Sequence, residues 1–405
     1  MPPASVAFRY VFFMIACAVS CQSRAQYEVD PGANAWLRGS VDVRVVRGGA
    51  APSWTDRGPG KTRYGGRFAD AGFERATRVV LSHLAIEAGA VLPWDVRAQA
   101  QLSVQPDIAD NWQPWLVEAI LRKEWGRDEN GWGAQAGVMN VPFSLEHTGP
   151  AWTPEFTLSA SALNSWLWDE ISFAGIEGEW WRVTGNRVRI SAMIGAGFGP
   201  DQLGRLLALR GWTLGDGLSG ANADLPLPAP GARMDIFDER DDRPAAYSRI
   251  SLGDEDERVA VTLGYFNNNG NEDVAGVWRT RVASVGVAFH PHARLDFLAQ
   301  YLRGEAKVRE PSNDSSVRAF YALLSYRHKR HRFTARYDDF RVRDLDGGVT
   351  STQESGDGFT LAYLLQMGLR HRIGFEHIWL NSRRPTSLVA EPTQDGWQLS
   401  YRFRY

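Results

Sequence analysis

The sequence predicts an all-β fold, a transmembrane antiparallel β-barrel of about 16 strands, with short turns at one end and long loops at the other. Three observations predict this fold: segments in which apolar and polar residues alternate, connections that are alternately short and long, and a C-terminal segment whose alternation reaches the last residue. An alternation of period two places the apolar side chains of a strand on one face and the polar side chains on the other. Such a strand can lie between lipid and water.

Sixteen segments show the alternation. They cover residues 36–46, 77–90, 94–105, 114–126, 131–141, 171–183, 186–198, 246–254, 257–267, 276–290, 293–304, 316–328, 331–342, 357–368, 371–382 and 395–405. About ten residues, at about 3.3 Å each and tilted near about 45°, cross a hydrocarbon layer roughly 25 Å thick. Because all backbone groups in that layer must be paired, we expect the last strand to close on the first.

The connections between these segments alternate between short and long. The long connections include residues 47–76, 142–170, 199–245, 268–275, 303–315, 343–356 and 383–394. Barrels of bacterial outer membranes have short periplasmic turns and long external loops, whereas a soluble β-sandwich has no reason to sort its connections in this way. The pattern therefore favours a location in a bacterial outer membrane.

The N-terminal residues 1–25 are interpreted as a signal peptide. Arg9 precedes the apolar run 11–19, and small residues lie at the expected cleavage site near Ala25. The apolar run is too short to span a bilayer as a helix. The barrel is then expected to be a single domain over residues 26–405.

The composition excludes several classes of protein. The chain has 45 basic and 47 acidic residues, and loss of Arg9 and Arg24 with the signal peptide leaves 43 against 47, a net charge of −4. This balance is not typical of a nucleic-acid-binding protein, so no nucleic-acid partner is expected. No later window offers eighteen uninterrupted apolar residues, which excludes a helical membrane protein. Both cysteines lie within the predicted signal peptide, although Cys21 leaves open a lipid-anchored N-terminus.

The phase of segment 331–342 predicts which face of the barrel is polar. Phe333 and Tyr337 share one face, and Arg336 lies on the other. An arginine near the bilayer midplane costs about 2–4 kcal/mol, so Arg336 is expected to point inward. The same phase in other segments predicts a set of pore-lining arginines, here called the basic arc. Its members are Arg38, Arg44, Arg97, Arg294, Arg336, Arg372, Arg402 and Arg404. Wall side chains cannot fill so wide a ring, which predicts a water-filled interior.

The final strand carries five bulky apolar residues on one face. They are Trp397, Leu399, Tyr401, Phe403 and Tyr405. This pattern resembles the C-terminal assembly signal of outer-membrane β-barrels. The resemblance implies that the outer-membrane assembly machinery is a partner of the chain.

The segment 137–146 has the pattern Gly-x-x-x-x-Pro-Phe-x-x-Glu, with Pro142 ending a predicted strand. It resembles a segment of porins of the phosphate-selective O/P type. The resemblance implies a homotrimer of sixteen-stranded barrels in which loop 142–170 folds inward and narrows the pore. It also implies an acidic lining of that constriction, for which the candidates are Glu146, Glu155, Asp169 and Glu170. An ordinary external position for loop 142–170 stays open, and loop 199–245 is expected to be a long external loop.

The features together predict a porin, a channel for passive diffusion of small hydrophilic solutes or ions. The basic arc favours anions. A substrate-specific channel is the first alternative, and an outer-membrane barrel enzyme is the second. Against an enzyme, the sequence has no nucleotide-binding loop, no Gly-x-Ser-x-Gly and no His-Glu-x-x-His motif.

The remaining candidate groups have simpler interpretations. His83, His147 and His377 lie away from the turns and have no obvious serine partner. Acidic residues within 235–242 have no calcium-loop spacing and are interpreted as solvated loop charge. No metal and no cofactor are expected. The expected partners are outer-membrane lipid, the transported solutes or anions, two further copies of the chain and the assembly machinery.

Overall fold

The computed structural model describes residues 34–70, 72–109, 112–199, 201–227, 232–256, 258–309, 312–346, 353–384 and 393–405. The predicted signal peptide, residues 1–25, lies outside the described residues. Within these ranges, no helix has both the length and the hydropathy that a membrane-spanning helix requires.

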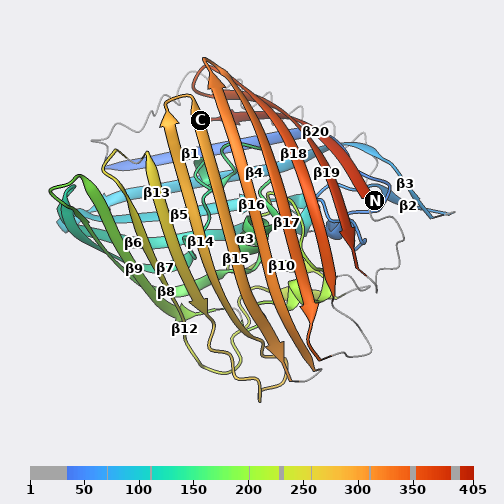
Figure 1. The fold of residues 1–405 in the computed structure, drawn as a ribbon, viewed down its shortest axis with the longest axis horizontal. Coiled ribbons are helices and arrows are strands. Elements are labelled where there is room, and N and C mark those ends of the chain that lie inside the picture. The colour runs from blue at the N-terminus through green and yellow to red at the C-terminus, as the bar shows by residue number, and fades with distance from the viewer. Residues whose placement is uncertain are drawn as a thin grey trace.

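Sixteen antiparallel strands form one closed barrel (Figure 1). They are β1 (Ala35–Arg47), β4 (Thr77–Leu92), β5 (Val96–Val104), β6 (Trp115–Arg127), β7 (Asn130–Asn140), β8 (Ser172–Val183), β9 (Val188–Phe198), β12 (Ala245–Asp254), β13 (Val259–Asn267), β14 (Arg279–His292), β15 (Leu295–Val308), β16 (Asn313–His328), β17 (His331–Asp344), β18 (Glu354–Met367), β19 (His371–Arg383) and β20 (Thr393–Arg404). Every predicted strand is confirmed. One long connection is not, because β15 and β16 extend further than expected and leave only residues 309–312 between them.

The first and last strands close the barrel. β1 pairs with β20 from Ser40 opposite Arg404 to Arg47 opposite Trp397. Tyr405 extends this ladder through two backbone hydrogen bonds with Gly39. A Cβ atom on Gly39 would lie 2.2 Å from the Tyr405 ring, so the C-terminal aromatic covers the glycine on the neighbouring strand.

The outer face of the barrel is apolar, as the alternation predicts. Phe333 and Tyr337 are about half exposed, and Arg336 between them is fully buried. The same phase leaves Leu399 and Tyr401 of β20 exposed while their neighbour Arg402 is buried. The predicted inward and outward faces of β17 and β20 are therefore those of the structure.

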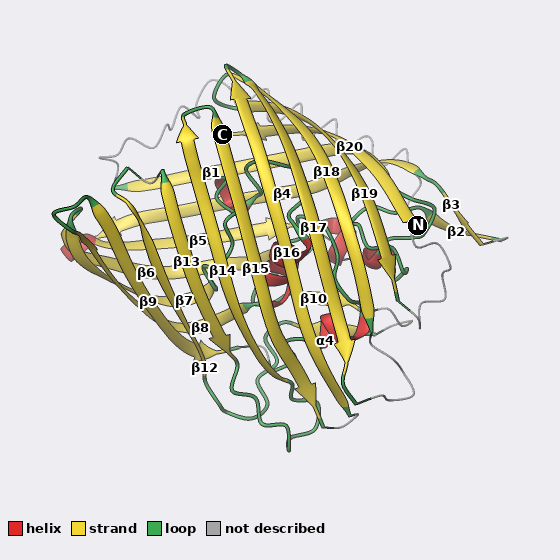
Figure 2. Ribbon diagram, viewed as in Figure 1, coloured by secondary structure: helices red, strands yellow, loops and turns green. Residues whose placement is uncertain are grey.

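The interior differs from the expected water-filled lumen, because described parts of three long connections fold into the barrel. They are L1 (48–76), L3 (141–171) and L4 (199–244). Together with the connection 105–114 they carry α2 (Pro106–Ala109), α3 (Ala162–Glu170), α4 (Arg205–Leu209), the 3-10 turns η2 (Trp54–Asp56) and η4 (Pro150–Trp152), and the short strands β2 (Arg67–Ala69), β3 (Gly72–Glu74), β10 (Asp224–Pro226) and β11 (Arg233–Asp235). The turn between β4 and β5 holds the remaining 3-10 turn, η3 (Pro93–Asp95). Figure 2 shows helices within the ring of strands. Loop 199–245 is one of the three inserted connections, so the prediction that it is an external loop is wrong for its described buried residues.

The half of the barrel near the long loops is filled by apolar packing. Trp166 of α3 and Trp212 of L4 contact each other edge to face, with ring centroids 5.8 Å apart. They belong to one buried cluster with wall residues such as Phe266, Phe340 and Leu380. The wall alone could not fill this space, but the inserted loops do. The prediction of a water-filled interior therefore holds only toward the short-turn end, where open cavities remain among the described residues.

Gly137 of β7 permits the close approach of β6 where L3 begins. Its φ is +141°, and a Cβ atom would lie 1.9 Å from the carbonyl oxygen of Ala119. We expect Gly137→Ala to lower the free energy of unfolding by about 1–3 kcal/mol through backbone strain, as measured by equilibrium urea unfolding in detergent. Gly178→Ala is the control, because a Cβ atom there meets nothing within 4 Å. Equal unfolding midpoints for the two variants would contradict the expectation.

Candidate functional site

Arg336 holds L3 against the barrel wall. The guanidinium is fully buried and donates to Glu146 Oε1 at 3.1 Å, to the Ser159 carbonyl at 2.6 Å and to the Ala160 carbonyl at 2.9 Å. Its Nε donates to Asp338 Oδ2 at 2.9 Å. The prediction that Arg336 lines an open pore is wrong, since its buried guanidinium is bonded to L3, to Asp338 of its own strand and to Thr360 of β18.

Glu146 is enclosed by its own loop. Its carboxylate accepts hydrogen bonds from the backbone N–H of Ser161 at 3.0 Å and from Asn164 Nδ2 at 2.6 Å, and it is 1% exposed. Ser161 caps α3 by accepting from the N–H of Asn164. The proline at 142 thus ends β7 as expected, but Glu146 is a structural acceptor and not part of an acidic constriction.

Asp169 and Glu170 join L3 to L4. Asp169 accepts from Arg210 Nη2 at 2.8 Å. Glu170 accepts from the backbone N–H groups of Gly204 at 3.1 Å and Leu206 at 2.9 Å, at the N-terminus of α4. Both carboxylates are buried. Their predicted place on the pore lining is therefore wrong as well, because each is used to pack one loop on the other.

A second buried network ties L1 and L4 to β1 and β20. Asp216 of L4 accepts from Arg44 at 2.6 Å and from Arg63 of L1 at 2.9 Å. Asp42 of β1 accepts from Arg44 at 2.9 Å and from Arg402 at 2.6 Å. All five side chains are at most 2% exposed. Arg44 and Arg402 point inward as predicted, but they hold loops in place and do not line open space.

The Asp216 contact makes the position of L4 sensitive to acid. Burial alone would raise the pKa of Asp216, but Arg44 and Arg63 outweigh it and hold the pKa at about 2. Because this pKa is below that of an unfolded aspartate, the contact stabilises L4 fully above about pH 4 and is lost as the pH falls through about 2. We expect hydrogen exchange in L4, corrected for its intrinsic rate, to accelerate only as the pH falls from about 4 through about 2. An identical acceleration in Asp216→Asn would contradict this assignment.

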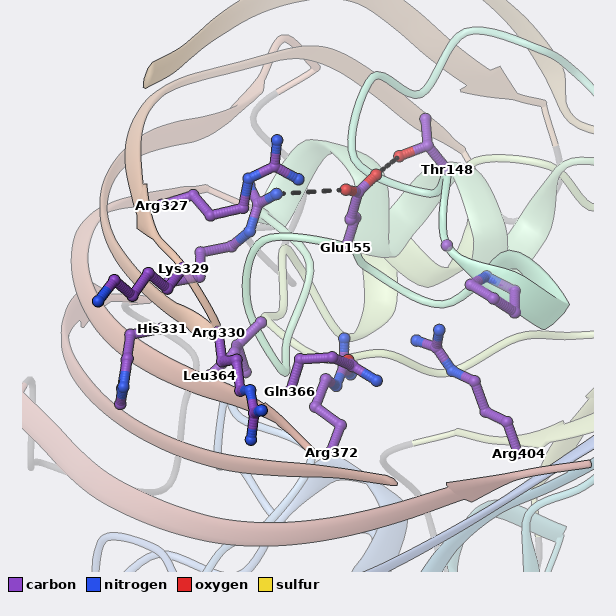
Figure 3. A pocket seen from close by; sticks show the side chains of 13 residues that line it. Thr148, Glu155, Arg327, Lys329, Arg330, His331, Leu364, Gln366, Arg372 and Arg404 are labelled. Atoms are coloured by element: carbon purple, nitrogen blue, oxygen red, sulfur yellow. Dashed lines mark hydrogen bonds and ion pairs between the residues drawn. The ribbon is translucent and has the colours of Figure 1, made fainter. Parts of the chain in front are cut away.

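Two adjoining cavities at the short-turn end, here called the vestibule, are lined by three further members of the basic arc, Arg38, Arg372 and Arg404. A cavity of about 1050 Å³ is lined by Arg38, Glu87 and Arg404, among others. A neighbouring cavity of about 420 Å³ is lined by Arg372, Arg404 and the basic side chains of the β16–β17 turn (Figure 3). Within the part of the chain that the structure describes, the vestibule is polar interior space that remains unfilled.

Glu155 faces the smaller cavity. It accepts from Thr148 Oγ1 at 3.0 Å and pairs with Arg332 at 3.4 Å, as Figure 3 shows for the Thr148 side. Among the four acidic residues predicted for the constriction, Glu155 is the one that lines a described cavity.

Two arginines of the basic arc lie at the rim. Arg97 is exposed near the β4–β5 turn, on the strand face that carries Gln99 and Gln101 of the larger cavity. Arg294 lies in the turn between β14 and β15, exposed, so its predicted place on the wall is wrong. β15 begins at Leu295, one residue after Arg294, so Arg294 lies outside the strand.

A serine–histidine pair is present where none was expected. Ser144 Oγ lies 2.9 Å from His147 Nδ1. The same oxygen accepts the backbone N–H groups of Glu146 and His147, which makes it part of a tight turn in L3. Burial lowers the pKa of His147 to about 3, far from the value near 7 that suits a general base. The pair is therefore suited to loop structure and poorly suited to catalysis.

Three carboxylates gather in L4. Ligand atoms of Asp201, Glu239 and Asp241 lie within 4.8 Å of one another. The Asp201 carboxylate already accepts the backbone N–H groups of Arg240 at 2.5 Å and Asp241 at 3.1 Å. These contacts give the group a structural role, in keeping with solvated or loop-bound charge.

Sequence reasoning missed two features. One is the run of basic residues in 327–332, whose side chains surround the smaller cavity, and its signal is visible as Arg-His-Lys-Arg-His-Arg at a predicted turn. The other is Asp216, which carries no distinguishing local pattern. Its partner Arg63 is 153 residues away in the chain.

The chain is similar to known proteins in structure, while its sequence has no match. No family model and no curated sequence matches the chain. An anion-selective porin from Comamonas acidovorans is 11% identical with a TM-score of 0.53, and the alignment covers 92% of this chain and 99% of that one. OmpF of Salmonella typhi, in complex with daunomycin, is 12% identical with a TM-score of 0.53, covering 91% and 97%. The outer membrane channel DcaP of Acinetobacter baumannii is 10% identical with a TM-score of 0.51, covering 92% and 97%.

At these identities the likeness establishes the fold. The chain has the fold of bacterial outer-membrane porins. A closed barrel of this size with an apolar outer face and fully paired strands belongs in a bacterial outer membrane. Its short-turn end, where both described termini lie, is then the periplasmic end.

Proposed function

We propose that the chain is an outer-membrane channel for small hydrophilic solutes, with a preference for anions. The observation that carries this proposal is the vestibule, a polar space inside a closed barrel in which cationic side chains outnumber anionic ones. A cluster of one charge sign within low-dielectric walls raises the local concentration of ions of the opposite sign. The porin-type fold of the barrel supports a transport role.

Ion selectivity tests the proposal. Purified protein in a planar bilayer should give stepwise conductance, and the reversal potential under a potassium chloride gradient should indicate that chloride is preferred. A unit charge about 10 Å from the path is worth about 0.4 kcal/mol at the dielectric constant of water, a factor of about two for each ion. We therefore expect Arg38→Gln to lower the chloride-to-potassium permeability ratio about two- to fourfold.

The control for this measurement is Arg318→Gln. Arg318 lies on the outer face near the long-loop end and pairs with Asp339 at 3.4 Å. The substitution Arg318→Gln should leave the reversal potential unchanged. Absence of conductance from correctly folded protein would refute the channel, and a cation preference in the parent protein would refute the anion preference.

A substrate-specific channel is the second candidate. The apolar packing of L3 and L4 against the wall leaves far less open space than a general diffusion pore of this strand number would have. Saturable block of the current by one class of solute would favour this candidate over general diffusion.

We further propose the accompanying features of such a channel. Cleavage near Ala25, recognition of the C-terminal strand by the assembly machinery and assembly into a homotrimer in lipid would follow from the sequence patterns. The resemblance of segment 137–146 to the phosphate-selective O/P type supports an inward L3 of that kind. The part-buried Ser144–His147 pair gives catalysis no support, because the serine oxygen belongs to a tight turn in L3.

A further inference from the structure

Strand register brings a group of basic residues together at the periplasmic ends of β16 to β20. Arg332 lies opposite Arg327 on β16 and opposite Leu364 on β18. Arg372 of β19 lies opposite Gln366 on β18 and opposite Arg402 on β20. The alternation places Arg332, Arg372 and Arg404, the last residue of β20, on the inner face, where all three line the smaller cavity.

Arg372 lacks hydrogen-bond partners for most of its guanidinium. The residue is 5% exposed, and its Nε and Nη2 atoms are buried with no acceptor within the described part of the chain. Arg404 Nε is in the same position. A buried cation without an anionic partner is costly, and such groups are normally paired. Arg372 and Arg404 nevertheless have no anionic partner in the described part of the chain, and both line the smaller cavity.

The acidic groups nearby are already engaged. Glu155 pairs with Arg332, and Asp296 pairs with the same guanidinium at 2.8 Å. Among described residues, Arg327, Lys329 and Arg330 form no ion pair with either of these carboxylates. Figure 3 shows these basic side chains gathered around the cavity with Glu155 as their acidic neighbour. The pocket carries a clear excess of positive charge.

We propose that this pocket binds a small organic anion with two or more carboxylate groups. A planar guanidinium can match a carboxylate through two parallel hydrogen bonds, and two guanidiniums, those of Arg372 and Arg404, line this cavity from neighbouring strands. The cavity of about 420 Å³ lies within the range of ligand pockets and greatly exceeds the volume of a single inorganic ion. Leu364 and Pro150 add apolar surface to its lining, which suits a carbon skeleton. As an account of which solute the channel carries, this inference rests on the proposed function.

Calorimetric titration of the full barrel in phospholipid-free detergent tests the site. Citrate should bind saturably, and acetate at equal ionic strength should not. We expect Arg372→Gln and, separately, Arg404→Gln to weaken citrate binding at least about tenfold, because each removes one guanidinium fork. Arg372→Lys should recover only part of the loss, since an ammonium keeps the charge without the fork.

The matched control is Arg187→Gln in the β8–β9 turn. Arg187 is exposed and pairs with Glu255 at 2.8 Å, away from the pocket. Citrate binding should be unchanged in this variant, and the circular dichroism of all variants should retain the β-sheet spectrum. Absence of citrate binding to folded parent protein would overturn the site, and so would equal binding of citrate and acetate or equal weakening by Arg187→Gln.

Conductance separates this inference from the channel proposal. Citrate added on the periplasmic side should reduce the single-channel current of the parent protein and have a weaker effect on Arg372→Gln. Binding without any conductance would refute the channel and keep the site. Conductance without citrate binding would keep the channel and refute the site.

Discussion

Replacing Arg336 with glutamine is expected to detach L3 from the barrel wall and to increase the single-channel conductance. The guanidinium is bonded to Glu146, to Asp338 and to two carbonyl groups of L3. Its removal leaves two buried carboxylates without their cation. Breaking a buried ion pair in this way costs about 3–5 kcal/mol, which raises the population of the detached loop by a factor of about 10² to 10³ or more.

Planar-bilayer recording measures this effect, together with the rate of proteolysis within L3. Arg318→Gln is the matched control, because it removes an exposed arginine from the neighbouring strand. Exposed pairs contribute little, so its conductance and proteolysis should equal those of the parent. An Arg336→Gln barrel that folds normally and conducts like the parent would show that L3 is held by its apolar contacts alone.

The second large effect is expected at Asp216. This carboxylate is shared by Arg44 of β1 and Arg63 of L1, both of them buried. Asp216→Asn keeps the shape of the side chain but leaves two guanidiniums short of one negative charge. We expect the bound position of L4 to lose about 3–5 kcal/mol, and L1 to loosen with it.

Hydrogen exchange over L1 and L4 reports this loss directly, because protection should fall in both loops together. Asp224→Asn is the matched control within L4, since Asp224 is partly exposed and pairs with Arg233 at the surface. Its exchange should match that of the parent protein. Loss of protection in L4 while L1 stays protected would show that Asp216 does not couple the two loops.

The strands were predictable from the sequence because lipid imposes a strict local rule. A strand with lipid on one face and a polar interior on the other must alternate, and the phase around Arg336 is fixed by the cost of placing an arginine in hydrocarbon. The rule needs no knowledge of distant residues. It therefore located all sixteen strands and the inward direction of Arg44, Arg372 and Arg402.

The contents of the lumen were not predictable in the same way. An acidic residue in a loop has one local signature whether it faces water, as Glu155 does in part, or is buried against another loop, as Glu170 is. The difference depends on contacts such as that between Glu170 and Leu206, which join loops through tertiary folding. The location of the basic run 327–332 could have been predicted, because successive short turns of a closed barrel lie beside one another.

The anchoring of the inserted loops sets an order for maturation. L3 precedes most of the wall in the chain, yet its seat includes Arg336 of β17, Glu376 of β19 and Arg402 of β20. A barrel that still lacks its final strands cannot offer all the residues that hold L3. Insertion of L3 into the lumen must therefore be among the last events of biogenesis, and a barrel without its final strands would have a wider lumen than the finished protein.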